Sequence, residues 1–193
     1  MRGRIAQLAA RLMAADGIQD FALAKRKAAR QLGAEVTQNL PNNSEIEQAL
    51  RDYQALYQRE EQRARLREMR KQALEAMREF AAFDPHLSGA VLSGTATRYA
   101  EINLMLFTDD QKEVELLLLN RGVPFKYSEK RYRLGDSLRS VPVLTLAGGE
   151  HAGVELVIFS TTALRHAPRH AGDGGPVEKA RRAEIEALLT LDS

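Results

Sequence analysis

An Asp-Pro pair at residues 84 and 85 separates two parts of the chain whose hydrophobic residues follow different periods. In residues 1–83, which are rich in Ala, Arg, Glu, Gln and Leu, apolar residues recur every three or four positions, as in helices. Beyond the pair, short runs rich in Val, Ile and Phe are typical of strands. We therefore expect an α+β fold, in which a helical N-terminal region (1–83) precedes a domain of residues 84–193 built on a mixed β-sheet flanked by helices.

Four helices are expected in the first part, over residues 3–14, 21–32, 44–57 and 59–83. Asp20 is placed to cap the second helix, and Ser44 with Glu47 forms a capping-box pattern at the start of the third. The fourth helix carries a heptad-like seam of apolar residues: Leu66, Met69, Ala73, Ala76, Phe80 and Phe83. The seam predicts packing along a neighbouring helix or along the second half of the chain. The alternative is a homodimer formed through the helix over 59–83.

In the second part, strands are expected over 89–92, 101–107 and 124–134, and a hairpin of residues 141–146 and 154–159 around Gly148-Gly149. A helix over 109–120, capped by Thr108, follows the strand over 101–107, and a last helix covers 177–189. Ile102, Leu104 and Leu106 alternate along their strand, so they share one of its faces.

The overall charge is small, with 28 Lys and Arg against 26 Asp and Glu. The balance conceals a basic N-terminal region, since residues 21–30 of the predicted second helix place Lys25, Arg26, Lys27 and Arg30 close together. Such a helix either faces a nucleic acid, RNA in particular, or is a solvated basic surface.

Absent residue types exclude several classes of protein. The chain has no cysteine, which excludes a disulfide framework, a thiolate nucleophile and Cys-ligated zinc. A metal held by oxygen ligands is expected to be Mg²⁺ or Mn²⁺. The sequence has no apolar stretch near the about 18 residues of a membrane span and no signal-peptide pattern, so we expect a cytoplasmic protein without membrane contact.

The most specific pattern begins with Gly89-Ala90 and Gly94, followed by Glu101-Ile102-Asn103 on a predicted strand. Alternate residues of a strand point to one side, so side chains 101 and 103 can reach the same ligand. Further on, Glu155 stands alone in an apolar strand. A carboxylate in that position costs free energy unless it is paired or binds a metal.

This arrangement over residues 85–160 resembles the DNA polymerase β-like nucleotidyltransferase superfamily, and within it a small, divergent proteobacterial branch. Gly89 and Ala90 occupy the place of the family's Gly-Ser pair, and Gly94 that of its second glycine. The resemblance implies a nucleotidyltransferase-like sheet domain whose glycine turn cradles a nucleoside triphosphate. It also implies transfer of a nucleotidyl group to a hydroxyl of RNA, protein or a small molecule.

The resemblance further implies that Glu101, Asn103 and Glu155 take the places of three catalytic, metal-binding carboxylates. Two positions depart from the family pattern, because Asn103 brings no charge and Ala90 lacks a hydroxyl. Three explanations stay open: a site that works with one metal ion, a catalytically inactive protein of this fold that binds nucleotide, RNA or a protein partner, and a coincidental match.

A basic ribbon over residues 125–133 offers further contacts for phosphates. Lys126, Lys130 and Arg131 alternate there with aromatic residues on which a base could stack. We count these three as candidate nucleotide-binding residues. The alternative is an exposed edge strand protected by its charges.

Overall fold

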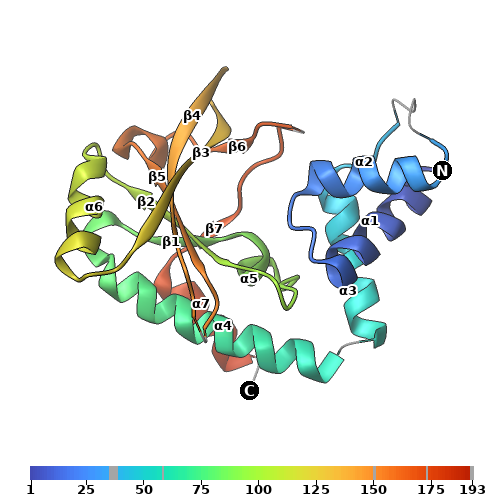
Figure 1. The fold of residues 1–193 in the computed structure, drawn as a ribbon, viewed down its shortest axis with the longest axis horizontal. Coiled ribbons are helices and arrows are strands. Elements are labelled where there is room, and N and C mark those ends of the chain that lie inside the picture. Colours follow the sequence, from blue (N-terminus) through green and yellow to red (C-terminus); the bar gives the residue numbers. More distant parts are fainter. Residues whose placement is uncertain (35–38, 58, 150, 173, 192–193) are drawn as a thin grey trace.

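A computed structural model of the protein describes residues 1–34, 39–57, 59–149, 151–172 and 174–191 (Figure 1). The fold is α+β, as the sequence predicts: helices come first, and a sheet flanked by helices follows. The helices are α1 (Arg2–Asp16), α2 (Phe21–Gln31), α3 (Asn43–Tyr57), α4 (Arg59–Glu79), α5 (Gly89–Ser93), α6 (Gln111–Asn120) and α7 (Arg182–Leu191), with short 3-10 turns η1 (Ala81–Phe83) and η2 (Thr161–Leu164). The strands are β1 (His86–Ser88), β2 (Ile102–Phe107), β3 (Phe125–Leu134), β4 (Ser137–Leu146), β5 (Val154–Phe159), β6 (Arg169–His170) and β7 (Lys179–Ala180).

The strands described form one mixed sheet in the order β6-β3-β4-β5-β2-β1-β7. Neighbouring strands β2 and β5 run parallel, and the other pairs are antiparallel. The strands predicted over 101–107 and 124–134 are therefore confirmed as β2 and β3. The predicted hairpin is confirmed as the antiparallel pair of β4 and β5.

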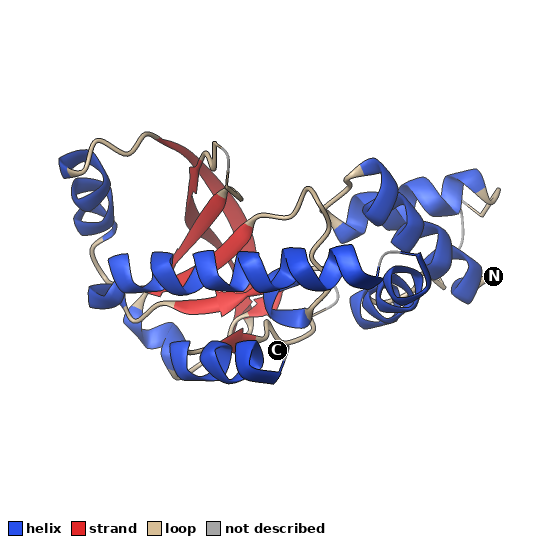
Figure 2. Cartoon of the chain, turned by 90° about the horizontal axis from the view of Figure 1, so that it is seen from below, coloured by secondary structure: helices blue, strands red, loops and turns tan. Residues whose placement is uncertain are grey.

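The two faces of the sheet bury different clusters of apolar residues. Ile102, Leu104 and Leu106 share one face, as predicted, and are buried with residues of α4, α6 and α7. Figure 2 shows α4 running across this face, with α7 beside it. Met105 and Phe107 belong to a smaller cluster with residues of β4 and β5. We call the face that carries Met105 and Phe107 the second face.

Helices α1, α2 and α3 form a helical unit with a core of its own. Many of its buried residues are alanines, whose small side chains let helices approach closely. The unit lies to one side of the sheet (Figure 1). Its buried residues are Ile5, Ala6, Ala9, Ala10, Leu12, Met13, Ala14, Ala24, Ala28, Ala29, Ile46 and Leu50.

The capping predictions for this unit had different outcomes. Asp20 caps α2 as predicted, and its carboxylate accepts a hydrogen bond from the Leu23 amide. The prediction for α3 was wrong, because Asn42 and Glu45, rather than Ser44 and Glu47, exchange reciprocal hydrogen bonds. The sequence Asn-x-x-Glu satisfies the first amides of the helix as well as Ser-x-x-Glu does, and it stands two residues earlier.

The heptad seam of the fourth helix is buried within the chain. Met69, Ala73, Phe80 and Phe83 belong to the core between the helices and the sheet, so the predicted intramolecular packing is confirmed. A homodimer through 59–83 would have to use another face of α4, and it stays a prediction. α4 lies before the predicted boundary at residue 84, but its buried residues belong to the same core as those of the sheet.

Three local predictions were wrong. Residues 89–92 form the short helix α5 rather than a strand, because Gly89 has a φ of +70°, outside the β region, and the strand β1 ends just before it. α6 is capped by Asp110 instead of Thr108. The last helix begins at Arg182, since residues 179–180 pair with β1 as strand β7. None of the helices described is long and apolar enough to cross a membrane.

Candidate active site

A row of polar residues crosses the second face of the sheet. Asn103 on β2 is the direct cross-strand partner of Glu155 on β5, so the two lie about 4.8 Å apart across the sheet. Residues opposite each other in register share a face, which extends the row over six strands. From β7 to β3 the row is Lys179, Ser88, Asn103, Glu155, Thr145 and Lys126.

Glu101 directly precedes β2, two residues before Asn103, and continues the alternation that puts it on the same face. Burial raises the pKa of Glu101, the nearby charge of Glu155 raises it further, and Lys130 lowers it. These electrostatic contacts place both carboxylates in one neighbourhood. Glu101 and Asn103 are thus neighbours of Glu155, and the roles of all three as site residues stay a prediction.

Glu155 is buried and forms an ion pair. Its side chain is 9% exposed, and its Oε2 accepts a hydrogen bond from the Nζ of Lys130 over 2.5 Å. The Lys130 side chain is 48% exposed, so the ion pair lies where the apolar sheet meets solvent. This pair supplies the compensation that a lone carboxylate in an apolar strand requires. Tyr132 lies close by, where burial and then the charge of Glu155 raise its pKa to about 12.

Gly89 touches the row at Asn103. A Cβ at Gly89 would lie 2.9 Å from the Nδ2 atom of Asn103, and the φ of +70° also favours glycine. The Nδ2 atom of Asn103 donates to the Glu101 carbonyl, over 3.3 Å. The glycine therefore lets the first turn of α5 lie directly against this amide side chain.

Arg70 of α4 fixes the other end of α5. The Arg70 side chain is buried, its Nε donates to the carbonyl of Val91 over 3.2 Å, and a terminal nitrogen donates to that of Leu92 over 3.3 Å. These carbonyls belong to the last turn of a helix and would otherwise lack partners. A buried charge thus sets the position of α5, and with it the position of Gly89.

The oxygen donors suit one hard divalent ion. Glu101 and Glu155 bring two carboxylates and Asn103 brings a neutral amide oxygen, which are donor types that Mg²⁺ and Mn²⁺ prefer. Two ions would need more charge than two carboxylates provide. Within the described residues, no group of three or more His, Cys, Asp or Glu side chains is placed to hold a metal.

Two predicted residues lie away from the row. Arg131 follows Lys130 on β3 and therefore points to the opposite face of the sheet. Gly94 ends α5 at its far side, where a Cβ would approach Leu66 and Arg70. Ala90, the second residue of α5, lies beside Gly89.

Three residues of this region have no role in the sequence prediction. Ser88 directly precedes the glycine motif, and its neighbourhood in the sequence could have indicated it. Lys179 and Arg70 carry no such signal, because their places depend on pairings between distant segments. The Nζ of Lys179 lies 4.8 Å from the centre of the Phe107 ring, and burial lowers its pKa.

Comparisons with known proteins give only distant similarities. No protein-family model and no curated protein matches the chain. One similar solved structure is a cytoplasmic RNA terminal U-transferase, with 19% identity over 51% of this chain and 28% of that chain, and a TM-score of 0.31. Another is the GLD-2/RNP-8 complex, with 15% identity over 61% and 48%, and a TM-score of 0.32. Values this low carry no argument about function, and the chain spans less than half of either protein.

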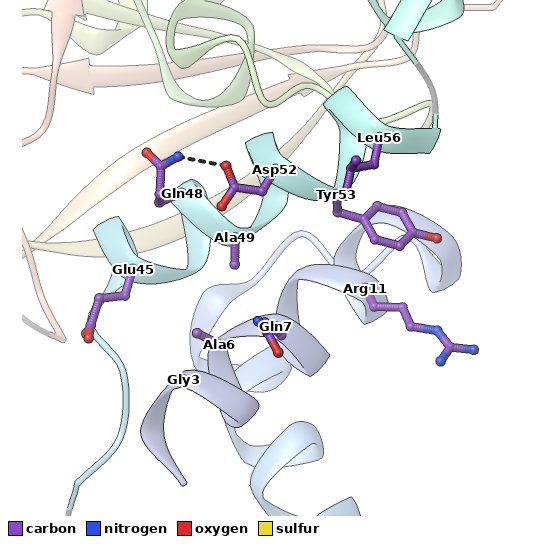
Figure 3. A pocket seen from close by; sticks show the side chains of 10 residues that line it. All are labelled: Gly3, Ala6, Gln7, Arg11, Glu45, Gln48, Ala49, Asp52, Tyr53 and Leu56. Atoms are coloured by element: carbon purple, nitrogen blue, oxygen red, sulfur yellow. Dashed lines mark hydrogen bonds between the residues drawn. The ribbon is translucent and has the colours of Figure 1, made fainter.

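The hollow drawn in Figure 3 belongs to the helical unit and not to the row. It has a volume of about 770 Å³ and lies between α1 and α3. Small residues of both helices, Ala6 and Ala49 among them, form its floor, and Tyr53 and Leu56 stand at one end. Because its lining residues all precede residue 57, the hollow contributes nothing to the polar row.

Proposed function

We propose that this protein is a divergent nucleotidyltransferase whose site is the polar row on the second face. The observation that supports this function is the placement of Glu101, Asn103 and Glu155 on one face, with Asn103 and Glu155 as cross-strand neighbours. Glu101 and Glu155 would hold one Mg²⁺ or Mn²⁺ ion, with the amide oxygen of Asn103 as an auxiliary ligand. When bound, such an ion neutralises charge on the phosphates of the nucleotide.

Two lysines of β3 and the glycine motif would bind and orient the nucleotide. Lys126 and Lys130 offer ammonium groups to its phosphates, and the backbone amides of Gly89 and Ala90 would contact them. The oxygen of an acceptor hydroxyl would bond to the α-phosphorus, and the bond from that phosphorus to the β-bridging oxygen would break. Pyrophosphate leaves, and the hydroxyl proton passes to solvent. The acceptor is a hydroxyl of RNA, protein or a small molecule, and a cytoplasmic setting would supply both nucleotide and Mg²⁺.

A transfer assay with isosteric variants tests this function. The protein is incubated with α-phosphate-labelled nucleoside triphosphates, Mg²⁺ or Mn²⁺ and total cellular RNA. We expect label transfer by the native protein and a loss of about a hundredfold or more in Glu101→Gln and in Glu155→Gln. Glu129→Gln is the matched control, because Glu129 lies on β3 with its side chain on the opposite face. Transfer that persists in both site variants contradicts the proposal.

A second function is favoured by the neutral Asn103 and by the ion pair on Glu155, which both reduce the charge available to a metal. In this case the protein has the fold without catalysis and binds RNA or a protein partner. The basic residues of α2 would then carry the binding, although one of them, Lys27, already pairs with Asp16. No transfer, with RNA binding that survives Glu101→Gln and is lost on neutralising Lys25, Arg26 and Lys27, supports this alternative.

A further inference from the structure

The positively charged ammonium of Lys130 occupies the place beside Glu155 that a metal ion would take. Its ammonium lies 2.5 Å from Oε2 of Glu155, a carboxylate that is 9% exposed. A divalent ion bound to Glu155 would share that oxygen or its neighbour with the ammonium. Two cations on one buried carboxylate repel each other, and the repulsion is strong where water is largely excluded.

The stem of Lys130 permits the ammonium to leave. Its side chain is 48% exposed, in contrast to the buried Glu155, and it projects from the long hairpin of β3 and β4. A lysine is a flexible four-carbon chain with a single charged end. It can therefore turn toward solvent, or toward another anion, while its backbone stays in the sheet.

A bound nucleotide would bring a second anion to Lys130. Lys126 lies on the same strand and the same face, four residues from Lys130, so the phosphates of a nucleotide lying along β3 would have an ammonium group on either side. A phosphate that attracts Lys130 leaves the carboxylate of Glu155 free for a divalent ion. Because binding free energies are reciprocal, the ion then also strengthens the binding of the nucleotide.

We infer that Lys130 is a built-in cation that competes with a divalent metal ion for Glu155 and that the phosphate of a bound nucleotide relieves this competition. The inference rests on the proposed function for the position of metal and nucleotide. It assigns to Lys130 a role in deciding when the site accepts a metal, beyond that of a simple phosphate contact. Without nucleotide, the native protein should bind divalent ions weakly.

The test measures Mn²⁺ binding to the full chain directly, from the electron paramagnetic resonance signal of free Mn²⁺. When nucleotide is absent, we expect Lys130→Met to bind Mn²⁺ at least about fivefold more tightly than the native protein. A factor of about five is the lower end of the affinity changes found between coupled sites. Arg131→Met is the matched control, since it removes one positive charge from the adjacent residue on the opposite face. It should leave the affinity for Mn²⁺ unchanged within twofold.

Two further measurements separate competition from indirect effects. The double variant Lys130→Met/Glu155→Gln should not show the increased affinity for Mn²⁺, because the carboxylate is then absent. Thermal unfolding monitored by circular dichroism verifies that each variant is folded. With α,β-methylene-ATP, the affinity for Mn²⁺ should rise more in the native protein than in Lys130→Met. Chelation by the nucleotide itself is common to both proteins, so the difference isolates Lys130.

Several outcomes overturn the inference. An affinity for Mn²⁺ that is equal or weaker in Lys130→Met, or a gain that persists in the double variant, excludes competition at Glu155. An equal response to α,β-methylene-ATP in both proteins excludes the relief by phosphate. The transfer assay is independent of these measurements. If the protein transfers label but Lys130→Met does not change the affinity for Mn²⁺, the proposed function stands and this inference is wrong. If Lys130→Met raises the affinity for Mn²⁺ but the protein transfers no label, the inference stands and the proposed catalysis is wrong.

Discussion

At the scale of single residues, the polar row shows how the surroundings of a carboxylate determine its chemistry. Glu155 is buried and has Lys130 as an ion-pair partner at hydrogen-bond distance. Glu101 is partly buried just before β2, where burial and the charge of Glu155 raise its pKa. From the sequence, Glu155 can be recognised as a carboxylate that needs compensation. The identity of its partner depends on the register of β3, β4 and β5, which no local pattern specifies.

Gly89 should be sensitive to the smallest substitution. Gly89→Ala introduces a methyl group 2.9 Å from Nδ2 of Asn103 in a backbone conformation with φ near +70°. Gly122→Ala is the matched control, because Gly122 has a φ of +66° and a Cβ placed there would meet no described atom within 4 Å beyond its chain neighbours. The control should lose about 1–2 kcal/mol from backbone strain alone. Gly89→Ala should lose more in urea unfolding, and equal losses would show that the contact with Asn103 is not restrictive.

The pKa of Glu101 predicts a pH-dependent effect on stability. Burial, and then the charge of Glu155, raise this pKa, so the folded protein binds the Glu101 proton more tightly than the unfolded chain does. The contribution of Glu101 to the stability of the fold is fully present below its pKa in the unfolded chain. That contribution is lost as the pH rises through its pKa in the folded protein. Glu101→Gln should therefore be more stable than the native protein at pH 7, with a difference that disappears at about pH 3.

Glu129 provides a control of opposite sign for that measurement. Hydrogen bonds from Ser140 and Tyr127 lower the pKa of Glu129, so its contribution to stability is present above the unfolded pKa and is lost as pH falls through the folded pKa. Glu129→Gln should be less stable than the native protein at neutral pH. Urea unfolding at several pH values measures both variants, and differences of the same sign would contradict the assignment.

At the scale of secondary-structure elements, periodic patterns predict what local sequence controls. The alternation around Ile102 and Leu104 predicts β2 and its buried face, and the apolar seam of α4 predicts packing within the chain. The short apolar run at residues 89–92 fits a strand or a helix equally well. It becomes α5 because Gly89 turns the backbone and Arg70 binds the last turn of the helix. Arg70 lies 21 positions from the carbonyl of Val91 that it binds, so no local pattern reveals this contact.

Arg70 should therefore control the stability of α5. Arg70→Met removes the hydrogen-bond donors to the buried Val91 carbonyl and to the partly buried Leu92 carbonyl, and we expect a loss of about 3 kcal/mol in the free energy of unfolding. The amide of Thr95, which donates to the Ala90 carbonyl at the end of α5, should exchange faster with solvent. Arg63→Met is the control, because Arg63 is an exposed residue of the same helix and should change stability by less than about 0.5 kcal/mol. Equal effects of the two variants would show that α5 does not depend on this side chain.

At the scale of the whole molecule, polar contacts join the core of the helical unit to the larger of the two clusters buried on the sheet. Buried residues of α1, α2 and α3 form one cluster, and those of α4, the sheet, α6 and α7 form another, with no member in common among the residues described. Between the two units, Gln54 of α3 donates to the Thr95 carbonyl, and Gln19 donates to the Tyr99 carbonyl. Hydrogen bonds of this kind contribute about 0.5–1.5 kcal/mol each, far less than the burial of an apolar core.

The two units should therefore open separately. Leu50→Ala creates a cavity in the helical unit and Leu104→Ala one in the sheet unit, and each should cost about 2–5 kcal/mol locally because both side chains are fully buried. In amide hydrogen exchange, Leu50→Ala should speed exchange in α1 and α3 and leave β2 and β5 unchanged, and Leu104→Ala should do the reverse. Each variant serves as the control for the other. If either substitution speeds exchange equally in both units, the polar contacts couple them into one cooperative structure, and the position of the helical unit then depends on the sheet that carries Glu101, Asn103 and Glu155.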